Sequence, residues 1–198
     1  MGLAQRNSKS YTPEEYLELE RQADVRHEFL DGEIYAMAGG SKRHNGISVN
    51  VIRLLGNQLL EDDCSVYGSD MRVKITSTGK YTYPDVVAVC GEEFFEDESE
   101  DTLLNPMLIV EVLSKSTEAY DRGGKFEYYQ TISTFSEYVL IAQEPFRVEQ
   151  FVRKDKNVWT YFEFRKPDEV VKLNSINCKL LLKDIYHKIQ QKFPKEVI

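Results

Sequence analysis

The stretch YPDVVAV, residues 83–89, decides how this sequence is read, together with a second run, MLIVEVL, residues 107–113. Both runs have the apolar, β-branched composition of buried strands, and each holds one carboxylate, Asp85 or Glu111, where a core residue is expected. An ionised carboxylate inside a buried strand is costly unless a partner compensates its charge. If the two strands are neighbours in one sheet, the pattern predicts a shared divalent cation with oxygen ligands and, with it, metal-assisted hydrolysis.

The two carboxylates are expected at different depths in their strands. Asp85 follows Pro84, which lacks a backbone N–H and therefore favours the first residue of a strand or an edge. Asp85 would then lie near a strand end, where water and substrate can reach a bound ion. Glu111 lies deeper and, by the period of two, shares a strand face with Ile109. A charged residue at an apolar position is the kind of conflict that a functional site produces.

Length and composition indicate one soluble globular domain. The chain has 198 residues, of which 41% are hydrophobic and 29% charged. No apolar run approaches the ~20 residues that span a bilayer, and the polar segment Met1–Ser10 does not resemble a secretion signal. The three cysteines are an odd number without a CxxC pair, which predicts reduced thiols and a cytoplasmic protein.

The charge distribution weakens nucleic-acid binding without excluding it. A net charge of −8 argues against broad, non-specific binding to nucleic acid. Seven acidic residues and no basic one lie between Glu92 and Asp101, whereas basic residues outnumber acidic ones from Arg147 onward. We interpret the acidic segment as a solvated loop between two strands, with a pseudo-substrate or a partner surface as the alternative.

Local signals predict an α/β (α+β) fold with a mixed sheet flanked by helices. TPEE, residues 12–15, is a capping box that begins a helix, and Asp31-Gly32 is the turn of a strand pair over 25–37. Ser41 caps a helix over about 42–60. The remaining segments are predicted as strands over 66–75, 83–90, 107–113, 136–142, 148–152 and 158–164, and as helices over 117–132 and 181–189. We expect a disordered tail over 1–10, one domain over 11–190 and a C-terminal tail over 191–198.

Phosphodiester hydrolysis also needs a cation near the scissile phosphate. Lys125 is the candidate, because it lies on the helix that follows Glu111, at helical spacing from Asp121 and from Tyr128 or Tyr129. The alternative is an exposed Asp121–Lys125 pair on a helix surface, which would contribute only about 0.3–0.5 kcal/mol.

These motifs resemble the PD-(D/E)XK nuclease superfamily and, within it, the Uma2 family of restriction endonuclease-like proteins. The resemblance rests on the order and spacing of several short segments and covers roughly residues 11 to 190. The segments are RHEFLDGEI (26–34), Met37, GGS (39–41), His44, YPDVV (83–87), IVEVLS (109–114) and YDRGGKFEYY (120–129).

The resemblance implies a restriction-endonuclease-like core and a Mg²⁺ site, with Mn²⁺ as a substitute. The ion would be bound by Asp85 and Glu111 with the backbone carbonyl of Val112. The superfamily lysine usually follows the glutamate by two residues, where this chain has Leu113, so Lys125 would take over its role.

The resemblance also implies supporting roles for two further residues and a substrate. Glu28 matches the His-Glu pattern of the family, and His44 lies in the first turn of a helix, where a capping or hydrogen-bonding role is the alternative. DNA is the implied substrate, and a homodimer is compatible with it because duplex cleavage needs two cuts.

Three functions remain open from the sequence. The leading hypothesis is a metal-dependent endonuclease that hydrolyses DNA phosphodiester bonds. The alternatives are a catalytically inactive nuclease-fold module that binds nucleic acid or protein, and a metal enzyme acting on another phosphoester. An aromatic stripe over 151–164 either stacks on bases or supplies sheet core and a dimer face.

Overall fold

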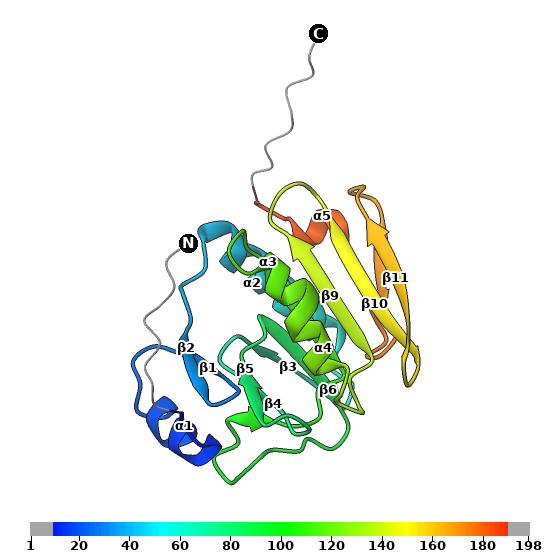
Figure 1. The fold of residues 1–198 in the computed structure, drawn as a ribbon. Helices are drawn as coiled ribbons and strands as arrows, with labels where there is room; N and C mark the ends of the chain where they lie inside the picture. The colour runs from blue at the N-terminus through cyan, green and yellow to red at the C-terminus, as the bar shows by residue number, and fades with distance from the viewer. Residues whose placement is uncertain (1–9, 190–198) are drawn as a thin grey trace.

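The computed structural model describes residues 10–189, and its centre is a six-stranded mixed sheet (Figure 1). From one edge to the other, the sheet contains β11 (Val158–Phe164), β10 (Val148–Asp155), β9 (Glu137–Ala142), β8 (Leu108–Leu113), β6 (Val86–Cys90) and β3 (Cys64–Gly68). β8 and β9 are parallel, and the other neighbouring pairs are antiparallel. The two apolar runs of the sequence are therefore adjacent strands, β6 and β8.

Helices cover both faces of this sheet. One face carries α2 (Lys42–Gln58), and the other carries a continuous helical segment made of α3 (Glu118–Tyr120), the π-helical turn η1 (Asp121–Lys125) and α4 (Phe126–Tyr129) (Figure 1). Val110 and Val112 of β8 pack in a core with α2, whereas Ile109 and Leu113 pack in a second core with Tyr129 of α4. Residues of β8 at odd positions thus face the α3–α4 segment.

A second, five-stranded sheet lies beside the first. Its strands, in order, are β2 (Glu33–Ala36), β1 (His27–Leu30), β5 (Lys80–Thr82), β4 (Arg72–Ile75) and β7 (Thr102–Leu103). The helix α1 (Pro13–Glu20) packs on it through Tyr16, which stacks on Phe29. Near the C-terminus, the hairpin β12 (Val170–Leu173) and β13 (Cys178–Leu181) leads into the short helix α5 (Leu182–Ile185).

The structure confirms the local signals at three element boundaries. Thr12 and Glu15 form the capping box of α1, and the Ser41 hydroxyl accepts the N–H of His44 at the start of α2. Asp31 and Gly32 have positive φ angles of 51° and 83°, as the tight turn between β1 and β2 requires. The terminal tails predicted over 1–10 and 191–198 lie outside the described residues, apart from Ser10.

Several predicted elements are corrected by the structure. The single strand predicted over 66–75 is wrong, because β3 ends at Gly68 and β4 begins at Arg72 in the other sheet. A turn separates the two strands, with Met71 N–H bonded to the Gly68 carbonyl at 3.0 Å. The sequence analysis also missed β5, β7 and the β12–β13 hairpin, and the last helix is shorter than predicted. Elements of two to four residues hold too few positions for a period to show.

The cysteine prediction is wrong for two of the three residues. Cys64 and Cys90 form a disulfide between β3 and β6, where the strand register places them directly opposite each other. Cys178 is a free, buried thiol, as predicted. An odd number of cysteines cannot reveal a disulfide that depends on strand register. The cytoplasmic compartment, which was inferred from reduced cysteines, stays a prediction. Within residues 10–189, no helix is long and apolar enough to cross a membrane.

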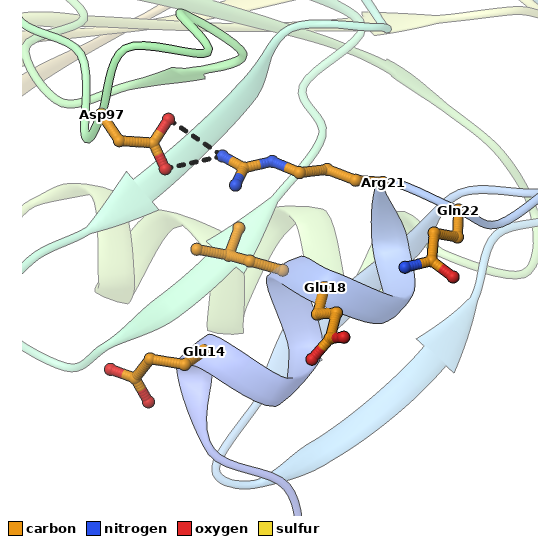
Figure 2. Close-up of a pocket in the computed structure, with 6 residues that line it drawn as sticks. Glu14, Glu18, Arg21, Gln22 and Asp97 are labelled. Carbon is orange, nitrogen blue, oxygen red and sulfur yellow. Dashed lines mark hydrogen bonds and ion pairs between the residues drawn. The ribbon is translucent and has the colours of Figure 1, made fainter.

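The acidic segment after β6, residues 92–101, forms ion pairs with the rest of the fold and is not a fully solvated loop. Arg21 at the end of α1 pairs with Asp97 at 2.7 Å and with Asp101 at 2.9 Å, and Figure 2 shows the first of these pairs. Asp101 also pairs with Arg72 at 2.8 Å. Partial burial opposes the ionisation of Asp101, but hydrogen bonds from Arg21, Thr102 and Arg72 outweigh burial and lower the pKa of its carboxyl.

Replacing Asp101 with asparagine should lower the free energy of unfolding at neutral pH by about 1 kcal/mol, allowing for the partial exposure of the pair. The reason is that Arg72, whose side chain is 2% exposed, would lose a charged partner. The pKa of Asp101 is lower in the folded state, so this stabilisation is complete above the unfolded pKa of about 4 and is lost as the pH falls through the folded pKa. Urea denaturation of both proteins over a pH series measures the difference.

The exposed Asp168, replaced by asparagine, is the matched control. Equal stability of the Asp101→Asn protein and the wild type at neutral pH would contradict the assignment.

Candidate active site

Glu111 is the only charged residue of β8 and is 3% exposed. Its neighbours on the same strand face, Ile109 and Leu113, belong to the core under α4. Burial raises the pKa of Glu111 well above its ordinary range; Lys125 lowers it in part, and the negative charge of Asp85 raises it further. The prediction that Glu111 occupies an apolar position on a strand face is confirmed.

Asp85 lies next to Glu111 because β6 and β8 are antiparallel. Val86 pairs with Val110, so the residue before β6 comes opposite the residue after Val110. The Val112 N–H donates to Asp85 Oδ2 at 2.7 Å, and the Asp85 N–H donates to Glu111 Oε2 at 3.4 Å. The Asp85 side chain is 14% exposed, so it lies between the buried Glu111 and the surface.

Lys125 extends from η1 to the same point. Its Nζ lies 3.1 Å from Glu111 Oε1, 3.1 Å from Glu28 Oε1 and 3.6 Å from Asp121 Oδ1. Lys125 and Asp121 are both buried, so the alternative of an exposed surface pair is wrong. Burial alone would lower the pKa of Lys125, but the carboxylates around it, Glu111 first, raise it well above its ordinary value. The ammonium group therefore stays charged at neutral pH.

The two supporting residues of the prediction also lie here. Glu28, on β1, brings a buried carboxylate from the second sheet to Lys125, and the Tyr83 N–H donates to its Oε1 at 3.4 Å. His44, in the first turn of α2, places Nε2 3.1 Å from Asp85 Oδ2. The hydrogen bond with Asp85 raises the pKa of His44 and outweighs partial burial, which lowers it.

The sequence analysis named Asp121 and Tyr129 only as helical neighbours of Lys125 and gave neither of them a role in the site. The Tyr129 hydroxyl, which is buried, donates to Glu111 Oε1 at 3.2 Å and lies 3.0 Å from Thr82 Oγ1. Asp121 accepts a hydrogen bond of 2.7 Å from the Thr117 hydroxyl. Thr117, Asp121, Lys125 and Tyr129 recur at intervals of four residues, which was a usable signal for one helix face. Their burial could not be inferred from that spacing.

The site carries more negative than positive charge. Three buried carboxylates, those of Glu28, Glu111 and Asp121, surround the single ammonium of Lys125. Asp85 adds a fourth carboxylate, opposite the imidazole of His44. Burial, its first cause, raises the pKa of Asp121 as it does that of Glu111. The excess charge favours either protonation of a carboxylate or a bound cation.

Comparison with known proteins gives the family. Residues 13–182 match the family described as "Uma2: Putative restriction endonuclease". This chain belongs to the Uma2 family. The protein slr1290 of Synechocystis sp., which is described as uncharacterized, is 38% identical over 175 residues, covering 88% of this chain and 90% of that protein. A second Synechocystis protein, sll1609, also described as uncharacterized, is 39% identical over 156 residues, covering 79% and 88%.

A solved structure supports the fold. The Uma2 chain superposes on a crystal structure from Anabaena variabilis, titled as a putative nuclease belonging to DUF820, with a TM-score of 0.72. The superposition covers 88% of this chain and 97% of the other, at 17% sequence identity. At that identity the likeness concerns the fold alone, and the predicted restriction-endonuclease-like α+β core is confirmed.

The donor set of the Uma2 site suits a hard cation such as Mg²⁺. Asp85 and Glu111 offer carboxylate oxygens from adjacent strands, and Asp85 is partly accessible. Over residues 10–189, no group of three or more His, Cys, Asp or Glu side chains is arranged to hold a metal ion. Mg²⁺ does not require such a group, because it commonly uses one or two carboxylates and completes its shell with water and substrate phosphate. The role expected of the Val112 carbonyl stays a prediction.

Replacing Lys125 with methionine should lower the free energy of unfolding by about 3–5 kcal/mol at neutral pH, measured by urea denaturation in the presence of a chelator. The substitution keeps most of the side-chain volume but leaves Glu28, Glu111 and Asp121 buried without their cation. The pKa values of Glu111 and Asp121, which burial already raises, would rise further in the folded state, so the loss should shrink as the pH falls.

Lys115→Met, at an exposed lysine in the loop after β8, is the control and should change stability little. A Lys125→Met protein as stable as the wild type at neutral pH would show that the cluster does not depend on this charge.

Proposed function

We propose that this Uma2 protein is a metal-dependent endonuclease that hydrolyses DNA phosphodiester bonds, with Mg²⁺ or Mn²⁺ as its ion. The observation that carries the proposal is the convergence of three side chains: Asp85 directly before β6, Glu111 inside the adjacent strand β8, and Lys125 of η1, whose Nζ lies 3.1 Å from Glu111 Oε1. The family description as a restriction endonuclease supports the choice of reaction.

Each residue has a distinct task in this proposal. Asp85 and Glu111 would hold the ion, which when bound supplies Lewis-acid stabilisation and a water of lowered pKa. The Val112 N–H fixes one oxygen of Asp85, and the Tyr129 hydroxyl fixes one oxygen of Glu111, so both carboxylates are oriented before substrate arrives. Such orientation lowers the reorganisation needed during the reaction.

Lys125 acts as a fixed positive charge rather than as a proton acceptor. Its raised pKa keeps the proton on Nζ throughout the neutral range, so it can donate hydrogen bonds but cannot remove a proton from water. Its place beside Glu111 brings this charge close to a phosphate that approaches the ion. Lys125 would thereby stabilise the negative charge that develops in the transition state.

Lys125 also compensates for the absence of the superfamily lysine at position 113. Leu113 is 4% exposed and packs in the core with Ile109 and Tyr129, so that position carries no polar group. Lys125 supplies an ammonium to the same glutamate from across the sheet face. This contact favours the enzyme over the inactive nuclease-fold module, because an ammonium reaches Glu111 although position 113 supplies none.

Purified protein should nick duplex DNA only with Mg²⁺ or Mn²⁺, and Asp85→Asn and Glu111→Gln should each lower the rate by roughly a hundredfold or more. Both variants keep the shape of the side chain and remove the charge that would hold the ion. A nicking assay with supercoiled plasmid measures the rate, and titration with Mn²⁺ followed by electron paramagnetic resonance measures ion binding. Asp24→Asn, at an exposed residue of the α1–β1 loop, is the control.

Two outcomes would count against the enzyme. Cleavage that continues in excess chelator would exclude the ion from the reaction. Tight DNA binding that Asp85→Asn leaves unchanged, without cleavage under any divalent ion, would instead identify a binding module.

A further inference from the structure

β11 is an open edge of the six-stranded sheet (Figure 1). Among residues 10–189 it pairs only with β10, so the backbone N–H and C=O groups along its outer side are available to another strand. The opposite edge, β3, differs because each of its residues is half-buried and it packs against α2.

The side chains of β11 do not protect this edge. Val158, Tyr161 and Phe162 are 55%, 49% and 43% exposed. The strand contains neither lysine nor proline, the residues with which natural proteins usually block edge pairing, and Glu163 is its only charged residue. An edge strand in which five of seven residues are aliphatic or aromatic is typical of a surface that another strand covers.

We propose that β11 pairs in antiparallel fashion with β11 of a second copy of this chain, so that the two six-stranded sheets join into one. A segment that pairs with its own copy about a twofold axis is self-complementary if like charges do not face each other. With the axis at Tyr161, Glu163 comes opposite Trp159. With the axis at Phe162, Glu163 comes opposite Tyr161, whose hydroxyl already lies 3.3 Å from Glu163 Oε2 within one chain.

The charge of the chain favours this edge over other surfaces as a self-contact. A net charge of −8 opposes the approach of two copies in general. β11 carries a single acidic residue, and Arg165 pairs with that residue directly after the strand. Two copies can therefore meet here without bringing unpaired carboxylates together.

The position of β11 argues against a base-stacking role for its aromatic rings. β11 is three strands away from β8, a distance of about 14 Å at ordinary strand spacing. The inner ring, Trp159, packs against Phe126 and Phe135 in the core rather than facing outward. The strand has no basic residue for a phosphate backbone. The dimer does not depend on the proposed nuclease activity.

The dimer is tested with two variants of Phe162, each of which places like charges on the two copies at the proposed interface. Sedimentation velocity of the full chain across the micromolar range should show a dimer for the wild type. Phe162→Lys and Phe162→Glu should each raise the dimer dissociation constant by roughly a hundredfold. With the axis at Phe162 the two like charges would face each other directly, and with the axis at Tyr161 they would be diagonal neighbours on one sheet face. An equal mixture of the two variants should restore the dimer, because the charges are then opposite.

Val49→Lys, at a 62% exposed residue of α2, is the matched control and should stay dimeric. Circular dichroism verifies that each variant is folded. A monomeric wild type, or a dimer that both Phe162 variants retain, would overturn the proposal. So would a monomer whose DNA binding strengthens in Phe162→Lys and weakens in Phe162→Glu, which would assign the edge to nucleic acid.

Discussion

The structure depends most on the buried contact between the ammonium of Lys125 and the carboxylates of Glu28, Glu111 and Asp121. Glu111 belongs to the six-stranded sheet, Glu28 to the five-stranded sheet, and Lys125 with Asp121 to the π-helical turn. One positive charge therefore joins both sheets to the helical segment. Buried carboxylates require such a partner, since their desolvation is costly when they remain charged.

The charges around this contact also support the proposal that the site binds a cation. A single ammonium cannot balance the charge of its neighbours. Burial first, and then repulsion from neighbouring carboxylates, raise the pKa values of Glu111 and Asp121. Asp85 is the partly exposed carboxylate of the site, so a divalent ion would reach the site beside it. The hydrogen bonds from Val112 and Tyr129 hold the two strand carboxylates in place without neutralising them. The wider π-helical turn, a feature frequent at functional sites, carries Lys125 inward.

Sequence reasoning reached the core of the site because its residues violate local patterns. Asp85 and Glu111 interrupt apolar strands, so their presence demanded a compensating partner. Lys125 was identified by its place after Glu111, but its burial depends on how η1 packs on the sheet. Tyr129 occupies a position that reads as apolar, and only its hydroxyl reaches Glu111, so no periodicity distinguishes it from a core aromatic residue.

The errors in the fold have a common physical origin in long-range pairing. The break between β3 and β4 and the Cys64–Cys90 bridge depend on which sheet and which register each strand joins. The acidic segment is held by Arg21 and Arg72, which lie far from it in sequence. By itself, the sequence determined the strands around Asp85 and Glu111, the capped helices and the acid–base composition of the site, because these follow from local patterns. Only the tertiary structure decided that Lys125 and Tyr129 meet Glu111 and that Glu28 meets Lys125, since their approach is set by the packing of two sheets and a helix.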